Sequence, residues 1–281
     1  MGLNSFLKLI RIPNDIMIGI GVIIAEIIAN QGPPTAYNIV FGFLTGFLIS
    51  ASVMVINDIA DIDIDRINNP SRPLVRGEIS IKNAYYLAFF FMIIGCITSL
   101  FTGVYTLLLA ITFWIIGYLY NFYFKRKGLF GNALVSLSVA VPFIYGSIVI
   151  GGLSINNIIL SIEAFLTNMY REIIKGIIDI EGDKIFGVQT LAVKYGVRKA
   201  YIISIFFLAC AIVVSIFPYI WTTVINLEIY LSMIILTDVI LFLSVITPYI
   251  IKDRKGYLYS KRIVLLGMLL GMITFLLSNV S

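Results

Sequence analysis

Three aspartates at helical spacing form the first group of residues that could do chemistry. Asp58, Asp61 and Asp65 lie within a segment that begins at Asn57. Residues three, four and seven positions apart share one face of a helix, so this spacing predicts a stripe of three carboxylates, with Asp63 pointing elsewhere. Like charges on one face repel each other, and we therefore expect a cation between them.

A second acidic stripe is predicted about 118 residues further along the chain. Glu172, Asp179 and Asp183 share a helical face, and Lys175 lies near that face. Each stripe ends a long apolar segment, where carboxylates are partly desolvated and therefore costly. We interpret the two stripes as facing halves of one cation site.

The available side-chain types predict which cation this is. The chain contains no histidine, and its two cysteines, Cys96 and Cys210, lie inside apolar segments. Oxygen ligands favour a hard ion such as Mg²⁺, which proteins usually hold with one or two carboxylates while phosphate oxygens complete the octahedron. The stripes therefore predict a Mg²⁺-bridged diphosphate site. Solvated acids at a helix end are the alternative interpretation, and the matching second stripe favours the site.

Composition indicates that a membrane must position these residues. Of 281 residues, 60% are hydrophobic and 12% are charged, and the mean hydropathy is +1.01. Soluble domains are nearer half apolar and a quarter charged, so a soluble enzyme and a disordered chain are excluded. Long continuous apolar segments predict an all-α polytopic fold with nine transmembrane helices around a central cavity. The predicted spans are 14–30, 38–60, 83–101, 104–122, 130–150, 156–178, 200–217, 228–250 and 261–279.

The basic residues predict which side of the membrane carries the stripes. With nine spans, every lysine and arginine falls before the first span, in a loop on one side of the membrane, or at the end of a span on that same side. The positive-inside rule assigns that side to the cytoplasm. We therefore expect a multi-pass protein of the cell membrane, with the N-terminus and the active site cytoplasmic and the C-terminus extracellular.

The two halves of the chain also resemble each other. Each acidic motif is followed by a basic loop and by a similar start of the next span, Ser80-Ile81-Lys82-Asn83-Ala84 in one half and Gly196-Val197-Arg198-Lys199-Ala200 in the other. We interpret residues 1–281 as a single domain, with a pseudo-repeat of roughly 1–125 and 126–255 and a ninth helix at 261–279. Related halves would place the two stripes opposite each other around the cavity.

Cations near the stripes could bind the oxygens of a diphosphate. Arg72 lies in the loop after the first stripe, and Lys125 follows Tyr120 just past the fourth span. A cation stabilises a diphosphate most strongly in a closed pocket of low dielectric constant. Ordinary topology signalling explains the same charges, and position alone leaves both interpretations open.

The acidic motifs resemble those of the UbiA superfamily of intramembrane prenyltransferases. Asn57-Asp58-x-x-Asp61-x-x-x-Asp65 is similar to the first aspartate-rich motif of that family, and Asp179-Ile180-Glu181-Gly182-Asp183 is similar to the second. Arg11-Ile12-Pro13-Asn14 resembles an Arg-Pro-x-Asn element at the start of helix one, with Ile12 as a departure. The resemblance extends from about residue 6 to 279, and it implies a fold of nine helices.

The resemblance implies a role for each matching residue. Arg72 and Lys125 would contact diphosphate oxygens, and Asn14 and Tyr120 would line the pocket. The five aspartates of the motifs would be the catalytic residues. Together with one asparagine they would hold Mg²⁺, and the metal-binding set is Asn57, Asp58, Asp61, Asp65, Asp179 and Asp183.

The resemblance also implies the reaction. Arg171-Glu172, with Lys175-Gly176 leading into the second motif, is most similar to the archaeal ether-lipid branch of the superfamily. That branch implies Mg²⁺-dependent transfer of geranylgeranyl from geranylgeranyl diphosphate to the 2-hydroxyl of 3-O-geranylgeranylglyceryl phosphate, which forms the second ether bond of archaeal lipids. Prenyl transfer to an aromatic quinone or chlorin acceptor is one alternative. A cation-coupled transporter is another, although its acids would be expected near the bilayer midplane.

We expect ionisation to lead this reaction. Mg²⁺ and nearby cations would stabilise the departing diphosphate while an allylic carbocation forms in an apolar cavity. The proton of the attacking hydroxyl would go to a diphosphate oxygen or to a carboxylate such as Glu172. The acceptor carries a phosphate and needs an anion pocket, for which the candidates are Lys8, Arg11, Arg171 and Lys175.

Overall fold

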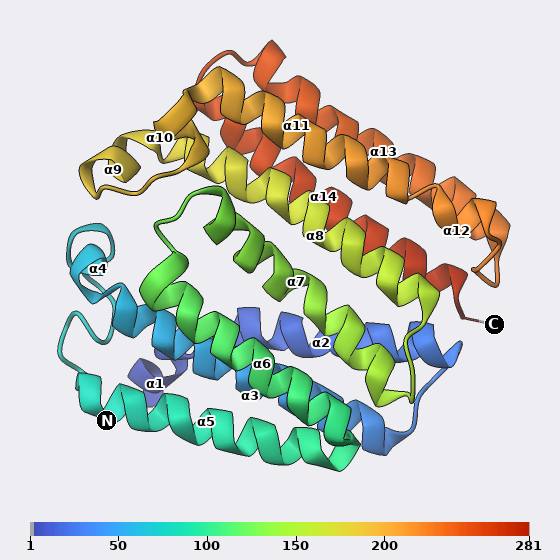
Figure 1. The fold of residues 1–281 in the computed structure, drawn as a ribbon, viewed down its shortest axis with the longest axis horizontal. Helices are drawn as coiled ribbons and strands as arrows, with labels where there is room; N and C mark the ends of the chain where they lie inside the picture. The colour runs from blue at the N-terminus through green and yellow to red at the C-terminus, as the bar shows by residue number, and fades with distance from the viewer. Residues whose placement is uncertain (1–2, 281) are drawn as a thin grey trace. The chain divides into compact units, whose positions relative to one another are not determined.

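The computed structural model describes residues 3–280, and within that range it consists of helices joined by turns and loops (Figure 1). The predicted all-α class is confirmed. The elements are α1 (Leu3–Leu9), α2 (Ile12–Asn30), α3 (Ala36–Ala60), α4 (Ile62–Asn68), α5 (Ile81–Thr102), α6 (Val104–Leu119), the π-helix η1 (Tyr120–Phe124), α7 (Leu129–Val149), α8 (Ile155–Ile178), α9 (Ile180–Ile185), α10 (Leu191–Tyr195), α11 (Val197–Val214), α12 (Phe217–Ile220), α13 (Leu227–Ile250) and α14 (Arg254–Ser278).

Eight segments of the described chain are helical, long and apolar enough to cross a bilayer. They are α2, α3, α5, α6 with η1, α7, α11 with α12, α13 and α14. The remaining predicted span, 156–178, forms α8, whose 24 residues include Glu163, Arg171 and Glu172. A helix of that length reaches about 36 Å, which is enough for a hydrocarbon core of about 30 Å. The protein is therefore a multi-pass membrane protein, and the count of nine spans stays a prediction.

The helix that contains the last predicted span begins before that span. The predicted span is 261–279, and α14 runs from Arg254 to Ser278. The Asp253 side chain caps this helix by accepting hydrogen bonds from the backbone N–H groups of Lys255, at 2.8 Å, and Gly256, at 3.3 Å. A search for apolar residues misses this first turn because its side chains are basic and polar, whereas a cap requires only a suitable oxygen.

The chain divides into two compact units. The first contains the residues up to Glu26 together with Pro34–Tyr123 and Tyr145–Gly152, and the second contains Ile27–Pro33, Phe124–Ile144 and the residues from Leu153 onward. Each acidic motif falls within a single unit. The expected single domain with a pseudo-repeat at 1–125 and 126–255 stays a prediction, and residues 1–2 and 281 of that domain lie outside the described residues.

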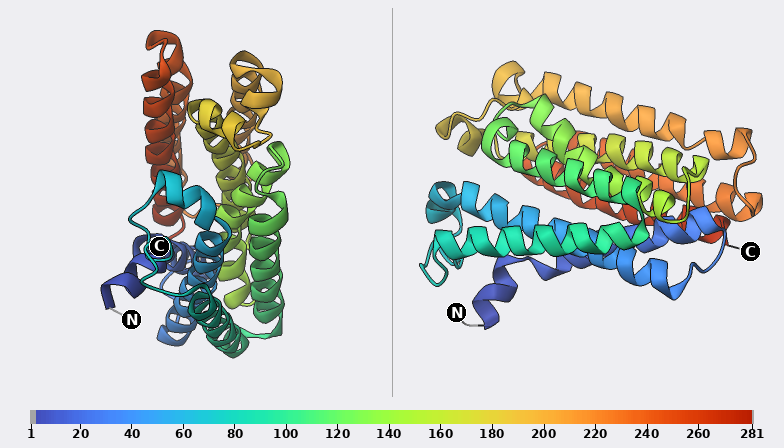
Figure 2. Two further views of the ribbon diagram at one scale, coloured as in Figure 1. Left: turned by 90° about the vertical axis from the view of Figure 1, so that its left-hand side faces the viewer. Right: turned by 60° about the horizontal axis from the view of Figure 1, so that its bottom comes forward.

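In the first unit, α3 and α5 lie side by side (Figure 2). Small residues allow this close approach, because Ala51, Ala84 and Ala88 are fully buried at the contact. The Ser52 hydroxyl donates to the Ala88 carbonyl at 2.7 Å and accepts from the Trp114 indole N–H at 2.7 Å. Three helices are thus fixed around the end of α3 that carries the first acidic motif.

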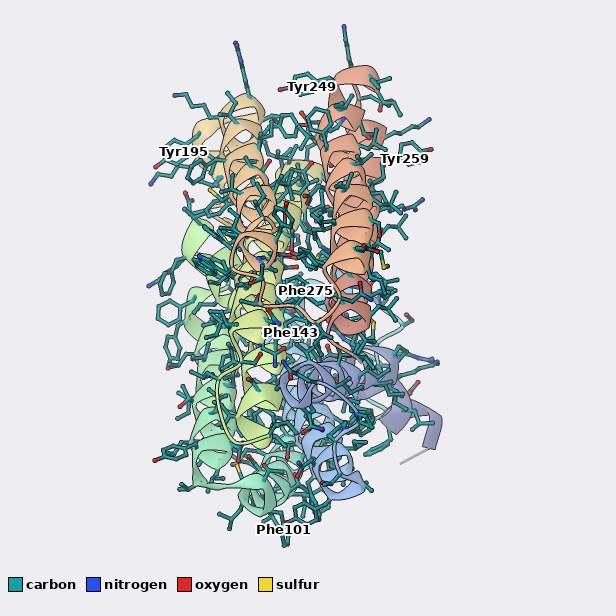
Figure 3. The ribbon with its side chains drawn as sticks, turned by 90° about the vertical axis from the view of Figure 1, so that its right-hand side faces the viewer. Phe101, Phe143, Tyr195, Tyr249, Tyr259 and Phe275 are labelled. Carbon is teal, nitrogen blue, oxygen red and sulfur yellow. The ribbon has the colours of Figure 1, made fainter. Side chains whose placement is uncertain are left out.

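In the second unit, Tyr170 joins α8 to α13 and α14. Its ring is fully buried, and its hydroxyl lies 3.0 Å from the Ser244 carbonyl and 2.7 Å from the Ser260 hydroxyl. Figure 3 shows Tyr249 and Tyr259 toward one end of this unit, with Phe275 farther along it. Exposed aromatic rings at helix ends are typical of the membrane–water interface.

The hydrogen bonds of Tyr170 to Ser244 and Ser260 fix α8, which leads into the second acidic motif, against α13 and α14.

Candidate functional site

The first acidic motif lies at a break between two helices. Helix α3 ends at Ala60 and α4 begins at Ile62, and Asp61 between them has φ −95° and ψ 2°. Helical hydrogen bonds nevertheless continue across the break, because the Asp61 N–H donates to the Asn57 carbonyl at 3.0 Å and the Asp65 N–H donates to the Asp61 carbonyl at 2.8 Å. The helical register of the predicted stripe survives, although the helix is interrupted.

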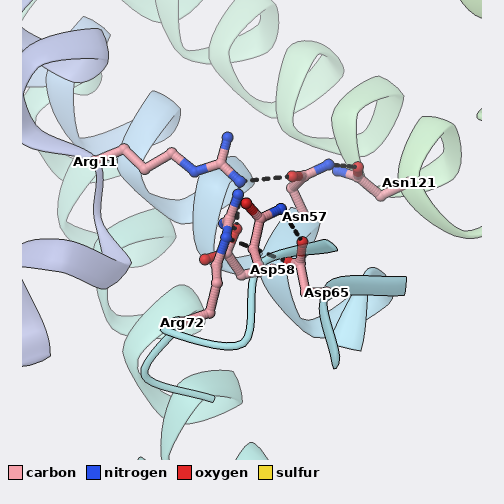
Figure 4. A network of polar contacts seen from close by, with 7 residues as sticks. Arg11, Asn57, Asp58, Asp65, Arg72 and Asn121 are labelled. Atoms are coloured by element: carbon pink, nitrogen blue, oxygen red, sulfur yellow. Dashed lines mark hydrogen bonds and ion pairs between the residues drawn. The ribbon is translucent and has the colours of Figure 1, made fainter. Parts of the chain in front are cut away.

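Asp58 lies at the centre of a cluster of arginines (Figure 4). Its side chain is only 2% exposed, and its Oδ1 atom accepts from Arg11 Nη2 at 2.5 Å and from Arg72 Nη1. Arg72 Nε also lies 3.4 Å from Asp65 Oδ2. Hydrogen bonds between two charged groups are roughly twice as strong as neutral ones. The structure therefore brings Arg72 onto the stripe and holds Asp58 as an ion-paired carboxylate.

Side-chain amides surround this cluster. Arg11 Nη2 donates to Asn57 Oδ1 at 3.2 Å, and Asn57 Nδ2 donates to Asn121 Oδ1 at 2.7 Å. Asn69 Nδ2 donates to Asp65 Oδ1 at 2.9 Å. Asn121 belongs to η1, and π-helical turns frequently occur at functional sites. Sequence reasoning gave no role to Asn69 or Asn121, which lie in a loop and in an apolar segment.

Arg11 contacts two residues of the first motif, and a role for it in binding the phosphate of the acceptor stays a prediction. It joins α1 to α2 with a positive φ of 44°, a conformation that non-glycine residues rarely adopt. Such strain persists only where surrounding contacts hold the residue, and here those contacts are the ones to Asp58 and Asn57. The Arg11-Ile12-Pro13-Asn14 element was the available signal. Asn14 itself is exposed, whereas the next residue, Asp15, is buried and accepts from the Ser50 hydroxyl at 2.6 Å.

The second acidic motif lies at a break of the same shape. Helix α8 ends at Ile178, α9 begins at Ile180, and Asp179 between them has φ −99° and ψ 11°. The Asp179 N–H donates to the Lys175 carbonyl at 3.0 Å, and the Asp183 N–H donates to the Asp179 carbonyl at 2.9 Å. Burial and the negative charge of Asp179 raise the pKa of Asp183. Asp179 and Asp183 thus lie one helical turn apart across the break, and a ligand shared between them stays a prediction.

Glu172 is held by two cations about two turns before this break. Its buried carboxylate accepts from Arg171 Nη1 at 2.5 Å through Oε1 and lies 3.6 Å from Lys175 Nζ through Oε2. Arg171 Nε is also buried and has no hydrogen-bond partner within the described chain. Buried donors are normally paired, so this N–H group has capacity for an added acceptor.

Lys125 begins a turn that contacts the loop after the second motif. The Gln189 N–H donates to the Arg126 carbonyl at 3.1 Å, and a Cβ at Gly128 would lie 2.2 Å from the Gln189 carbonyl oxygen. Gly128 has φ +54°, so glycine is required there for both space and conformation. Lys125 is half-buried in this turn, and Tyr120 begins η1 with a half-buried side chain. The second motif and Lys125 therefore belong to one connected region of the second unit.

The residues of the first motif fit a hard cation in their chemistry. Asp58 Oδ2 is buried and has no hydrogen-bond partner, so one oxygen of this carboxylate has capacity for a ligand. Asp61 and Asp65 add carboxylates at the same break. Within residues 3–280, however, no three acidic or other ligating side chains converge closely enough to hold an ion by themselves. Phosphate oxygens would have to complete such a site, as they usually do for Mg²⁺.

Comparison with known proteins assigns this arrangement to a family. A family model described as the UbiA prenyltransferase family matches residues 18–256. The chain is 33% identical over 264 residues to a digeranylgeranylglyceryl phosphate synthase of Sulfurisphaera tokodaii, covering 93% of this chain and 94% of that protein. It is 37% identical over 227 residues to the synthase of the same name from Methanococcus aeolicus, covering 78% and 77%.

Solved structures share the fold. One described as digeranylgeranylglyceryl phosphate synthase in membranes superposes with a TM-score of 0.87 at 30% identity, covering 99% of this chain and 98% of that one. A UbiA homolog from Archaeoglobus fulgidus, bound to DMAPP and Mg²⁺, superposes with a TM-score of 0.74 at 21% identity, covering 96% and 99%. Taken with the paired acidic motifs at matching helix breaks, these findings show that the chain belongs to the UbiA prenyltransferase family.

Proposed function

We propose that this protein transfers a geranylgeranyl group from geranylgeranyl diphosphate to the 2-hydroxyl of 3-O-geranylgeranylglyceryl phosphate. The reaction depends on Mg²⁺ and forms the second ether bond of archaeal membrane lipids. The observation that carries the reaction class is the pair of acidic motifs at equivalent helix breaks, at Asp61 and Asp179. The names of the relatives from S. tokodaii and M. aeolicus support this acceptor.

Carboxylates of both motifs would hold the metal. Bound Mg²⁺ would neutralise the diphosphate and so stabilise it as a leaving group. The first motif would supply one side-chain amide and three carboxylates, and the second motif would supply two carboxylates. The proposed set is Asn57, Asp58, Asp61, Asp65, Asp179 and Asp183.

Arg72 would bind diphosphate oxygens directly. Its guanidinium now contacts Asp58 and Asp65, and about a quarter of the side chain is exposed. A planar guanidinium can serve a carboxylate and a phosphate at the same time because it carries five N–H donors. The carboxylates therefore orient Arg72 toward the ligand, and they keep it in place when no ligand is bound.

Lys125 would contact the diphosphate from the second unit. The contacts of Arg126 and Gly128 with Gln189 join its turn to the loop that follows Asp183. A lysine is a compact point charge, which suits a diphosphate oxygen. Asn14 and Tyr120 would line the substrate pocket, as the family resemblance implies.

Arg171 and Lys175 would bind the phosphate of the acceptor. The unpaired, buried Arg171 N–H supports this assignment, because a phosphate oxygen would satisfy it. Glu172 would hold both cations in place through its two oxygens. Since cations already face both oxygens, we favour a diphosphate oxygen over Glu172 as the acceptor of the hydroxyl proton.

The active site would face the cytoplasm. Basic residues follow each acidic motif, with Arg66 and Arg72 after the first and Lys184 and Lys194 after the second. The positive-inside rule then places these loops and the N-terminus in the cytoplasm and the C-terminus outside the cell. Labelling of single cysteines at Lys184 and at Ser281 in sealed vesicles tests this orientation.

A cation-coupled transporter is the rival from another class. Fully buried Glu26, in α2, is the observation that favours it, because both of its carboxylate oxygens lack a hydrogen-bond partner in the described chain. The motif aspartates instead lie at helix ends, whereas transporters bind their substrates and ions near the bilayer midplane. Product formation by purified protein separates the two functions.

The test is incubation of purified protein with radiolabelled geranylgeranyl diphosphate, MgCl₂ and a panel of acceptors. We expect diphosphate release and a labelled diether lipid with 3-O-geranylgeranylglyceryl phosphate, and no product with EDTA. Asp61→Ala should abolish transfer, whereas Asp63→Asn, which changes the exposed acid of the same motif, should retain it. Labelled product from an aromatic acceptor alone would reassign the substrate, and no Mg²⁺-dependent product from any acceptor would refute prenyl transfer.

A further inference from the structure

We propose that Arg254 is a positioning residue for the second acidic motif, and that it acts by capping the end of α8 at the helix break. This inference rests on the proposed function, because it assumes that Asp179 and Asp183 hold Mg²⁺ and the diphosphate. It assigns a role in the site to the first turn of α14, which the motifs of the sequence did not include.

Arg254 contacts the break at two points. Its Nε–H donates to the carbonyl oxygen of Ile178, the last residue of α8, at 3.1 Å. Its Nη2 lies 4.0 Å from Asp179 Oδ1. The last carbonyl groups of a helix lack partners within the helix, so a side-chain donor at this point fixes the direction in which the chain leaves the helix. The ion pair itself is exposed and stabilises little.

The backbone of Arg254 is itself held firmly. Asp253 caps α14 through the N–H groups of the two residues that follow Arg254. A Cβ at buried Gly256 would lie 2.0 Å from the Ile251 carbonyl oxygen, so only glycine fits where the first turn of α14 packs against the end of α13. Tyr257 and Leu258 pack against the cluster that contains Ile178. The guanidinium therefore extends from a fixed base.

The elements around the second helix break lie together at one end of the second unit. Helices α9 and α10 and the α13–α14 turn all lie near the end of α8 (Figure 1). Arg254 is separated from Ile178 by 76 residues in the sequence. The contact therefore connects the last long helix of the chain to the point where the motif changes direction.

The first motif has an arginine in a related position. Arg72, from the loop after α4, pairs with Asp58 and Asp65 on either side of the break at Asp61. Arg254 differs because its stronger contact is to the main chain. We therefore infer that Arg72 acts on carboxylates and ligand, whereas Arg254 sets the backbone that carries Asp179.

Two roles for Arg254 predict opposite changes in the affinity for Mg²⁺ when the residue is replaced. If it positions the break, its loss lets the end of α8 fray and weakens binding of Mg²⁺. If it only competes with the metal for Asp179, its loss removes a competing cation and strengthens binding of Mg²⁺. The capping role also predicts that lysine rescues poorly, because an ammonium does not reproduce the fixed Nε–H donor.

The experiment measures metal binding without turnover. The melting temperature of purified full-length protein is measured at a fixed concentration of inorganic diphosphate over a series of MgCl₂ concentrations. The MgCl₂ concentration that gives half of the full shift in melting temperature is recorded. We expect Arg254→Gln to raise this concentration about tenfold, since a hydrogen bond from a charged donor is lost. Lys255→Gln removes the same charge from the adjacent exposed residue and should change it less than twofold.

The kinetic constants supply a second readout. In Arg254→Gln we expect kcat/KM for geranylgeranyl diphosphate to fall about tenfold and the KM for the glyceryl phosphate acceptor to change less than twofold. Arg254→Lys should recover less than half of the loss on a logarithmic scale. Limited proteolysis between residues 180 and 196, without ligand, should be faster in Arg254→Gln than in Lys255→Gln.

The outcomes separate the two proposals. An unchanged or tighter Mg²⁺ response in a folded Arg254→Gln variant, next to a normal wild-type response, overturns the role of Arg254 alone. Full rescue by lysine also overturns capping and assigns an electrostatic role. A wild-type protein that shows neither a Mg²⁺-dependent shift nor prenyl transfer overturns the proposed function itself.

Discussion

The substitution Asp58→Asn tests whether the first motif is held together by its ion pairs. The change removes one charge and keeps the size of the side chain. Asp58 is 2% exposed, and its partners Arg11 and Arg72 are 28% and 24% exposed. Breaking a fully buried ion pair costs about 3–5 kcal/mol, because a charge is left without its partner. Since both arginines keep partial access to water, we expect about 2 kcal/mol.

The direction of the change in stability distinguishes two roles of Asp58. If Asp58 served only as a metal ligand among repelling acids, its neutralisation would stabilise the metal-free protein. If it anchors Arg11 and Arg72, neutralisation destabilises that state. For a protein of this size, about 2 kcal/mol corresponds to a melting temperature lower by about 4 °C.

The assay is thermal unfolding in detergent with EDTA present. Asp63→Asn is the matched control, because Asp63 is 85% exposed and pairs with Arg66 on the surface, and it should shift the free energy of unfolding by less than about 0.5 kcal/mol. Asp58→Asn combined with Arg72→Gln should cost less than the sum of the single changes, since the two share one contact. A stability equal to or above that of the wild type in Asp58→Asn would refute the reasoning.

Three further substitutions probe the packing and the anion sites. Lys125→Ala should raise the KM for geranylgeranyl diphosphate at least fivefold and leave the KM for the acceptor within twofold; the reverse pattern in steady-state kinetics would move Lys125 to the acceptor site. Gly146→Ala should lower stability by about 1–3 kcal/mol, because its Cβ would lie 2.4 Å from the Val22 carbonyl oxygen, whereas Gly152→Ala, which meets nothing within 4 Å, should be near neutral in the same melting assay. Glu172→Gln should raise the KM for the glyceryl phosphate acceptor while retaining at least a tenth of kcat; loss of kcat beyond a thousandfold would instead identify Glu172 as the base.

The course of the long helices could be predicted because apolar segments end where polar residues begin. The predicted span 38–60 became α3, Ala36–Ala60, and the predicted span 228–250 became α13, Leu227–Ile250. The helical spacing within each motif was also predictable, since i to i−4 hydrogen bonds persist across the breaks at Asp61 and Asp179. The breaks themselves left no signal in the periodicity, because the hydrogen bonds that cross them keep the four-residue spacing.

Long-range contacts were the part that spacing could not supply. Arg11 reaches Asp58 only because the chain takes a positive φ between α1 and α2. Asn121 reaches Asn57 from a π-helical turn inside an apolar segment. Arg254 reaches Ile178 from a helix that begins seven residues before the predicted span. Each contact depends on tertiary packing, and a one-dimensional pattern of charges contains no such information.

The central claim is that both acidic motifs hold one metal-bound diphosphate. Its most direct test is binding of a non-reactive geranylgeranyl thiolodiphosphate with Mg²⁺ to the wild type, to Asp61→Asn, to Asp183→Asn and to the double variant. We predict one ligand per chain, a loss of at least a hundredfold in affinity in each single variant, and little further loss in the double variant, because the two residues act on one ligand. Two ligands per chain, or losses that add in full, would contradict the claim.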